Sequence, residues 1–386
     1  MIDFKIYNSV NQLPDSWDDL HTNDLFLKTP FLKSLEQSCP KNIHSNYIAI
    51  FKKDVLVGIA IIQRVEMYIE DVFRKTTDNT LKRFGKAIIA KIVRGNALIV
   101  GNLMHTGQHG LYFNTKKINQ TVFLDTIFKV IDTLTIQIKK EYKKNIRIVG
   151  FKDYFESDTI IKNEAIFTNN HLYKVQVQPN MILHIPKEWN TFDDYVFTLR
   201  KKYKQRYKSA FKKAVDITKK ELSLEDIDLF SAQIYSLYKN VSDNAKVNSF
   251  VLHDRHFFSL KKQLKDNFKL FGYYLNEELV GFYTLIINNN KLETYFLGYN
   301  PGLQHQHQLY LNMLYDMLKF GIENKLETVV YARTAMEIKS SVGAKPFTMF
   351  IYMKHTNNFI ANSALKFIVK TLNPIKEWVE RHPFKA

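Results

Sequence analysis

The stretch YARTAMEIKSSVGAKP, residues 331–346, places one arginine at the joint between a predicted strand and a predicted helix. The residues TVVYA (328–332) are apolar without alternation, which is typical of a central strand covered on both faces. Arg333 would then emerge at the carboxyl end of this strand, beside the N–H groups of a helix N-terminus. Open α/β sheets bind ligands at this position, and such N–H groups can hold an anion or a developing oxyanion. The structural alternative is that Arg333 pairs with a neighbouring carboxylate.

The residues after this arginine predict a short helix and both of its ends. Thr334 and Glu337 have the spacing of a capping box, which would explain the glutamate without chemistry. Gly343 is placed to end the helix, and FTMFIYMKH (347–355) reads as the last strand. Lys339 and Glu337 are candidates for substrate binding, although Lys339 could equally be a surface lysine on the same helix.

The order of elements around this stretch occurs twice in the chain. In each half a β-hairpin is followed by a strand that ends in glycine, a long amphipathic helix and a further strand. Such a repeated order predicts two related α/β domains. The corresponding segments are 47–63 and 268–287, 97–102 and 294–300, 118–144 and 308–324, and 146–150 and 328–332.

The first half contains an insertion at about 66–95. Gly58 and Gly101 are 43 positions apart, whereas the matching Gly281 and Gly298 are 17 apart. Apolar residues within 81–94 recur at helical spacing and are flanked by lysines and arginines. This pattern predicts a basic amphipathic helix, which would lie on an anionic membrane surface or pack on its own domain.

The composition bounds the partners and the compartment. The chain has 386 residues, with 55 Lys and Arg against 38 Asp and Glu, and a formal charge of +17. This excess favours acidic partners such as nucleic acid, an anionic membrane, phosphorylated cofactors or an acidic carrier protein. The single cysteine, Cys39, cannot form an internal disulfide. With no signal-peptide pattern and no apolar run long enough to span a bilayer, we expect a cytoplasmic protein.

Between the two halves lies a strongly basic helical segment. Eight of the fourteen residues from 200 to 213 are Lys or Arg. Like charges four residues apart, such as Lys204 and Lys208, cost a helix about 0.2–0.5 kcal/mol each, so we expect an anion to meet this face. A merely solvated face is the alternative. The apolar seam comprises Leu199, Tyr203, Tyr207, Ala210 and Ala214, and the substrate-binding candidates are Lys201, Lys204 and Arg206.

The whole order, ending in a short helix, a glycine and a final strand, resembles the GNAT acyltransferase superfamily. The tandem arrangement, TLRKKYKQRYKSAFKKA (198–214), YFLGYNPG (295–302) and ARTAMEIKSSVGAKP (332–346) resemble its Fem-type, peptidoglycan-biosynthesis-like branch, which includes BioF2-like acetyltransferases. The resemblance is clearest over 190–355. It implies an α/β (α+β) fold of two GNAT-like domains in tandem, each a mixed, mostly antiparallel sheet flanked by helices.

We predict an N-terminal domain at 1–185 and a C-terminal domain at 186–386. The C-terminal domain would contain the basic helical region 190–266 and the C-terminal helices. The stretch 357–386 predicts one amphipathic helix and a second short helix after Pro374. Residues expected to close a core there are Phe359, Leu365, Ile368, Val369 and Leu372; a membrane anchor using Lys366, Lys370 and Trp378 is the alternative.

The resemblance implies transfer of an acyl group from an activated donor to an amine. In GNAT enzymes two neighbouring strands splay apart, a thioester donor enters between them, and the amine attacks directly. The corresponding strands would be 291–299 and 328–332, with Tyr299 and Arg333 near their ends. A base must accept the amine proton, because a protonated amine cannot attack. The candidates for this base are Glu293, His253 and His256; His253 is also a candidate for substrate binding.

The expected donor loop departs from the pattern of the superfamily. GNAT enzymes hold the donor pyrophosphate with Q/R-x-x-G-x-G/A, whereas the loop NPGLQHQHQLYLN (300–312) has one glycine and no second glycine in register. Acyl-CoA, an acyl carrier protein and aminoacyl-tRNA therefore stay open as donors, and we expect no tightly bound cofactor and no metal. The candidate donor-binding residues are Gly302, Gln304, His305, Gln306 and His307.

The matching loop of the first half, LMHTGQHGLYFN (103–114), has two glycines spaced like the end of a phosphate loop. However, the strand joint IVGFKDYF (148–155) has no arginine at the matching place. We therefore expect the first domain to be a structural or substrate-shaping copy and the second to be the working one.

Three functions stay open from the sequence. The first is an N-acyltransferase for a small-molecule or lipid amine, such as a cell-envelope precursor. The second is a Fem-type aminoacyl-tRNA-dependent peptidyltransferase, and the third is a non-catalytic binding module. Peripheral contact with an anionic membrane is an expectation compatible with each.

Overall fold

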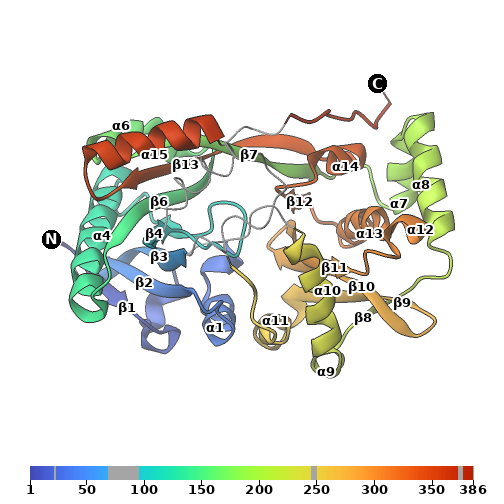
Figure 1. Ribbon diagram of the computed structural model, residues 1–386, viewed down its shortest axis with the longest axis horizontal. Coiled ribbons are helices and arrows are strands. Elements are labelled where there is room, and N and C mark those ends of the chain that lie inside the picture. Colours follow the sequence, from blue (N-terminus) through green and yellow to red (C-terminus); the bar gives the residue numbers. More distant parts are fainter. Residues whose placement is uncertain (21–22, 68–94, 245–249, 373–376, 386) are drawn as a thin grey trace, which may run out of the picture. The chain divides into compact units, whose positions relative to one another are not determined.

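The computed structural model describes residues 1–20, 23–67, 95–244, 250–372 and 377–385. They form two compact units (Figure 1). The first comprises Met1–Val177 with the described parts of Lys246–His253 and Thr348–Ile375, and the second comprises Gln178–Ala245, Asp254–Phe347 and Lys376–Ala386. The basic helix predicted at 81–94, and nearly all of the insertion at 66–95, lie outside the described residues.

The first unit contains a mixed sheet in the order β1-β2-β3-β4-β6-β13. Its neighbours are antiparallel except β4 and β6, which are parallel. The long helix α4 buries Phe123, Leu124 and Ile127 against this sheet. The elements are β1 (Ile2–Tyr7), α1 (Thr29–Gln37), β2 (Ile43–Lys52), β3 (Val55–Met67), β4 (Gly95–Val100), β5 (Leu111–Phe113), α4 (Gln120–Tyr142), β6 (Ile146–Phe155), α5 (Thr159–Lys162), α6 (Glu164–Asn169), β13 (Lys345–His355) and α15 (Phe359–Leu372).

The second unit repeats this pattern in the order β8-β9-β10-β11-β12-β7. Here β11 and β12 are the parallel neighbours. The amphipathic helix predicted at 308–324 is confirmed as α13, which buries Leu309, Met313, Leu314 and Met317 in the core. The elements are β7 (Tyr173–His184), α7 (Phe192–Thr198), α8 (Lys201–Lys213), β8 (Thr218–Glu221), α9 (Leu224–Leu229), α10 (Ser231–Asp243), α11 (His256–Leu264), β9 (Phe268–Leu275), β10 (Glu278–Asn288), β11 (Lys291–Tyr299), α12 (Gln304–His307), α13 (Leu309–Glu323), β12 (Thr328–Ala332) and α14 (Met336–Ser341).

The predicted fold class and the repeat are confirmed, but the last strand of each sheet comes from the other half of the sequence. Residues 349–355 of β13, the final strand of the chain, pair with β6. Residues 181–184 of β7 pair with β12. The predicted limits 1–185 and 186–386 thus differ from the observed units mainly in the segment that contains β13 and α15.

Two predictions for the C-terminal stretch are wrong. Residues 377–385 contain no helix, so the short helix expected after Pro374 is not formed there. Phe359 does not close a core, because 84% of it is exposed, whereas Leu365 is fully buried as predicted. Val369 also packs against the core around Leu365.

Gly298 on β11 sets how closely α10 can approach the sheet. A Cβ at this position would lie 2.4 Å from the carbonyl carbon of Leu237 and 2.5 Å from the nitrogen of Tyr238. Both atoms belong to the α10 backbone, which cannot yield by a rotamer change. A side chain at position 298 therefore has to displace a whole helix.

We predict that Gly298→Ala destabilises the protein by about 1–3 kcal/mol through this overpacking. Urea denaturation of the purified variant measures the loss. Gly302→Ala is the matched control, because its Cβ would meet only the side-chain oxygen of Asn300, at 3.2 Å. Equal stability of the two variants would contradict the close packing of α10 on β11.

Candidate active site

The parallel pair β11 and β12 is joined over only part of its length. Its register runs from Lys291 opposite Thr328 to Glu293 opposite Val330. Beyond this point β11 continues to Tyr299, with β10 as its one strand neighbour in the described part of the chain. The two strands predicted to splay, 291–299 and 328–332, thus have the predicted bounds and do diverge.

A β-bulge in β11 coincides with the start of the divergence. Leu285 of β10 pairs with Thr294, but Tyr283 pairs with Leu297, so Thr284 faces two residues of β11. The buried hydroxyl of Thr284 donates a hydrogen bond of 2.6 Å to the carbonyl of Phe296. A bulge bends its strand and changes where the side chains point. It therefore accounts for β11 leaving the line of β12 directly after Glu293.

On the other side, the end of β12 is held in an unusual backbone conformation. Ala332, Thr334 and Ala335 have φ values of 59°, 72° and 47°. Non-glycine residues adopt this left-handed region rarely, and such strain clusters at ligand clamps and active sites. Lys339 of α14 stabilises this backbone conformation. Its Nζ donates to the carbonyl oxygens of Tyr331, Ala332 (3.3 Å) and Arg333 (2.9 Å).

Lys339 and Glu337, both candidates for substrate binding, have partners within the protein. Lys339 is 5% exposed, so it is not a surface lysine, and its three carbonyl partners account for its amine without a substrate. The predicted capping box is wrong, because α14 begins after Ala335 and has no side-chain cap. Glu337 instead forms an ion pair with Arg381, whose Nε donates to it over 3.1 Å. Gly343 ends the helix at φ 109°, as predicted.

Glu293 occupies the point where the strands separate. It is the last residue of β11 that pairs with β12, and it is 4% exposed. His256, at the start of α11, is also buried, and its Nε2 lies 3.2 Å from the hydroxyl of Tyr295. Two of the three predicted base candidates therefore lie in this unit, near the divergence. The third, His253, is exposed and belongs to the first unit.

Tyr299 and Arg333 mark the two far ends of the diverging strands. Tyr299 is half-buried, and its loss of solvent raises the pKa of the phenol, which favours the protonated form. Arg333 is half-buried and follows directly on β12. The site thus has a carboxylate where the strands part, and a phenol and a guanidinium at their ends.

Two side chains of the expected donor loop already form hydrogen bonds within the protein. The amide of Tyr310, in the first turn of α13, donates to Oε1 of Gln304 over 2.9 Å. His307 is buried, with Nδ1 3.0 Å from the carbonyl oxygen of Lys213. Gly302, His305 and Gln306 are exposed. Three of the five residues predicted to hold the donor are therefore accessible, and the other two have contacts that fix the loop.

The basic helix α8 confirms the predicted seam. Tyr203 and Tyr207 pack on the core of the second unit, and Ala210 is buried. The cations around this seam, which include Lys201, Lys204 and Arg206, form no ion pair among the described residues. Their charge is therefore not neutralised within the described part of the protein.

The corresponding strands of the first unit do not diverge. β4 and β6 pair from Asn96 opposite Ile146 to Val100 opposite Phe151, which is the end of β4. The following loop is bonded to β3 at both of its ends, since Gly101 N donates to the carbonyl oxygen of Ile61 and Ile61 N donates to the carbonyl oxygen of Gly110. The first unit thus lacks the geometric feature that defines the candidate site in the second.

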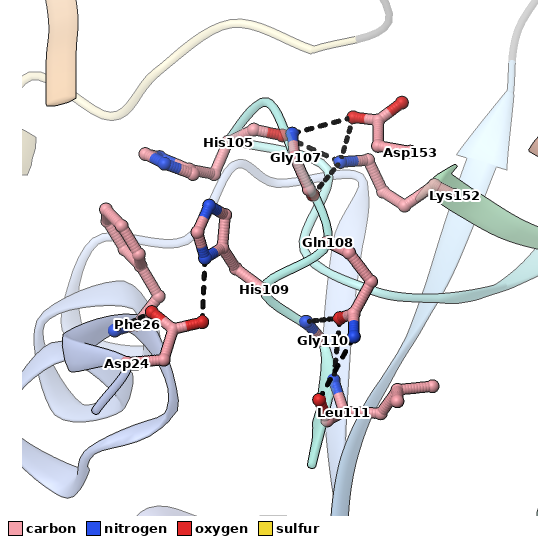
Figure 2. Close-up of polar contacts among 10 residues, drawn as sticks. All are labelled: Asp24, Phe26, His105, Gly107, Gln108, His109, Gly110, Leu111, Lys152 and Asp153. Carbon is pink, nitrogen blue, oxygen red and sulfur yellow. Dashed lines mark hydrogen bonds and ion pairs between the residues drawn. The ribbon is translucent and has the colours of Figure 1, made fainter. Parts of the chain in front are cut away.

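Figure 2 shows that the loop of the first unit is closed by charged side chains. Lys152 Nζ lies 2.6 Å from Oδ2 of Asp153 and donates to the carbonyl of His105 over 2.7 Å. The same carboxylate accepts the amide of Gly107 at 3.2 Å. A backbone N–H that a phosphate would need therefore contacts a buried carboxylate, which repels phosphate.

Only part of this cluster of charged side chains could be predicted from the sequence. Lys152 and Asp153 are adjacent charged residues inside an otherwise apolar strand, and this pattern is visible in the sequence. The contact between Nδ1 of His109 and Oδ2 of Asp24, at 2.7 Å, could not be predicted, because 85 positions separate these two residues in the sequence (Figure 2). The β-bulge opposite Thr284 could not be predicted either, because no local sequence pattern indicates it.

Lys339 gives a pH signature for the joint after β12. Burial lowers its pKa from the usual 10.5 to about 7. Between these values the unfolded chain binds more protons than the folded protein, so the stability contributed by this group rises with pH, by at most about 1.4 kcal/mol per unit. We predict that Lys339→Met removes this rise between pH 7 and 10, as measured by urea denaturation. Lys345→Met, which changes an exposed lysine, should keep it; parallel curves for wild type and Lys339→Met would refute the assignment.

Comparison with known proteins places this geometry in a known fold. No family model and no curated protein matches the chain. Among solved structures, the chain is similar to FemX, with a TM-score of 0.52 and 10% identity over 96% of this chain and 100% of FemX. It is also similar to a tandem GNAT protein from the clavulanic acid biosynthesis pathway, with a TM-score of 0.51 and 9% identity over 92% of this chain and 98% of that one. The chain therefore has a tandem GNAT, Fem-like fold.

Proposed function

We propose that the second unit transfers an acyl group from an activated donor to an amine, between the diverging ends of β11 and β12. The observation that carries this proposal is that strand pairing stops at Glu293 and Val330 while β11 continues to Tyr299. Beyond Glu293 no described strand pairs with this side of β11, and its N–H groups would bind the carbonyl oxygen of the donor. Such preorganised donors stabilise the negative charge that develops on an acyl oxygen.

The reaction needs no enzyme nucleophile. The amine nitrogen of the acceptor bonds to the acyl carbon, and the bond from that carbon to the sulfur or oxygen of the donor breaks. One amine proton passes to a base, and the leaving group acquires a proton. In this proposal Glu293 accepts the amine proton, and Tyr299, kept protonated by its raised pKa, supplies the second proton.

The similar tandem GNAT protein from the clavulanic acid biosynthesis pathway, which is described in its form without AcCoA, favours an acyl-CoA donor by analogy of fold. The loop before α13 is less open than a glycine-rich phosphate loop, because Gln304 already caps the Tyr310 amide. Arg333 and the accessible residues Gly302, His305 and Gln306 are the groups that would contact the donor.

A second candidate, an aminoacyl-tRNA or acyl carrier protein donor, is favoured by α8. Eight Lys and Arg residues within 200–213 have no acidic partner among the described residues. A polyanionic carrier would neutralise this face and release counterions. The acceptor, in either case, is an amine on a small molecule or lipid, and a cell-envelope precursor is one such acceptor.

The base assignment predicts a specific loss of activity. Purified protein is given a panel of acyl-CoA, acyl carrier protein and aminoacyl-tRNA donors with amine acceptors, and release of the free carrier is followed. Glu293→Gln should lower kcat by about 100-fold or more and flatten the acidic limb of the pH–rate profile. Glu278→Gln, an exposed glutamate on the neighbouring strand, is the matched control and should leave both unchanged.

Arg333→Ala should raise KM for the donor, because it removes a cation at the mouth of the site. The proposal fails if no donor of the panel is consumed, or if the Glu293→Gln and Arg333→Ala variants both keep full activity. Melting temperatures of all variants show whether a loss of activity reflects a loss of folding.

The α8 candidate predicts salt-dependent binding. Affinity for tRNA should fall steeply with salt, and Lys204→Gln/Lys208→Gln should reduce the slope of log K against log salt by about 1–2. Lys262→Gln/Lys291→Gln, which removes two other exposed charges of the same unit, should alter the slope less. Salt-independent or absent binding would exclude the tRNA-dependent reaction.

A further inference from the structure

The first unit contains an open cavity that the proposed transfer reaction does not use. Its volume is about 520 Å³, within the range of ~300–1,000 Å³ that is typical of small-molecule sites. It is bordered by α4, β6, β13 and α15, and by the turn that follows α6 (Figure 1). All of its lining residues belong to the first unit, so this unit forms the cavity by itself.

The floor of the cavity is apolar. Phe128 and Ile131 of α4 and Val149 of β6 line it, and all three are buried members of the core of the first unit. An apolar group that displaces water from such a surface gains about 25 cal/mol per Å² of buried apolar area. A ligand that fits this floor therefore carries a hydrophobic group.

Two opposite charges line the same cavity from different elements. Lys354 of β13 is half-buried, and Asp132 of α4 is exposed. Neither forms an ion pair with any residue that the structure describes. Burial lowers the pKa of Lys354, and the negative charge of Asp132 opposes this shift. The two charges are thus near enough to interact across the cavity, but they are not joined.

The ammonium group of Lys354 has unused capacity for hydrogen bonds. Its Nζ donates to the carbonyl oxygen of Asn170 over 3.0 Å, which is its one hydrogen bond among the described residues. An ammonium group has three donors, and a partly buried charge is costly when its donors are not matched by acceptors. An anionic group in the cavity would supply the missing acceptors.

The polar walls of the cavity are held in place by hydrogen bonds within the protein. Oδ1 of Asn362 accepts the amide of His355 at 2.8 Å, and its Nδ2 donates to the carbonyl oxygen of His171 at 3.1 Å. Oδ1 of Asn358 accepts the amide of Ala361 at 2.8 Å, which caps the first turn of α15. These bonds join β13, the turn after α6 and α15. The cavity is therefore formed before a ligand arrives, which lowers the entropy cost of binding.

We infer that this cavity binds a zwitterionic small molecule, an α-amino acid with an apolar side chain. The ammonium group of the ligand faces Asp132, its carboxylate faces Lys354, and its side chain covers Phe128, Ile131 and Val149. This inference does not rest on the proposed transfer reaction, because it concerns a cavity of the other unit.

Ligands with a single charge match the cavity less well. A fatty acid would place its carboxylate near the like charge of Asp132, and an aliphatic amine would place its ammonium near the like charge of Lys354. Like charges brought together in this way disfavour a ligand, whereas a molecule with both groups pairs each charge with its opposite.

The test is isothermal titration calorimetry of the full chain with L-leucine and L-phenylalanine. Both should bind at one site per chain, with a Kd of about 1 mM or tighter. Three analogues separate the parts of leucine: 4-methylpentanoate lacks the amine, 3-methylbutylamine lacks the carboxylate, and glycine lacks the side chain. Each should bind at least about fivefold more weakly than leucine, because each lacks one of the three contacts.

Two variants assign the charged contacts. Asp132→Asn should weaken the binding of leucine by about fivefold and should not weaken the binding of 4-methylpentanoate, which has no ammonium group to lose. Lys354→Met should weaken leucine by about tenfold and should not weaken 3-methylbutylamine. A purely structural role would weaken all of these ligands alike. Asp132→Asn changes an exposed residue, so it still tests the inference if Lys354→Met fails to fold.

Asp125→Asn and Lys139→Met are the matched controls, because both residues are exposed on α4 and neither lines the cavity. Both should bind leucine as the wild type does, and unchanged melting temperatures show which variants are folded. The inference is overturned if neither amino acid binds, if any of the three analogues binds as tightly as leucine, or if the controls lose as much affinity as Asp132→Asn.

Discussion

The candidate site of the second unit depends on one constraint: a strand can hydrogen-bond to a neighbour only where their backbones stay in register. β11 and β12 keep this register through Glu293 and Val330 and then lose it. The bulge opposite Thr284 turns β11 away, and the left-handed residues after β12, held by Lys339, end that strand early. The backbone of β11 is thereby left with one side that no described strand occupies, and a carboxylate stands where the two strands part.

The first unit shows what the same topology does without this feature. Its parallel strands stay paired to the end of β4, and its loop is closed on the Lys152–Asp153 pair. Both sheets have the same strand order and the same parallel pair, so topology alone does not produce the site. The difference lies in a few contacts, which supports the division into a working unit and a structural one.

The sequence predicted the elements better than their contacts. Hydrophobic patterns identified both hairpins, both long helices and the bounds of the two diverging strands, because these depend on residues close in the chain. The exchange of final strands could not be read, since β13 has the same local pattern whichever sheet it joins. The capping box at Thr334 failed because Lys339 imposes a different backbone, and the exposure of Phe359 was missed because both faces of α15 are apolar.

The most direct test of the central claim is amide hydrogen exchange of the whole chain with and without an acyl donor. We predict that a bound donor slows exchange at residues 294–299 of β11, because the donor's carbonyl oxygens accept hydrogen bonds from N–H groups on the side of β11 that β12 leaves. Residues 96–100 of β4, which are paired along their length, should be unaffected. Donor binding that leaves 294–299 unchanged, or that protects β4 instead, would contradict the account.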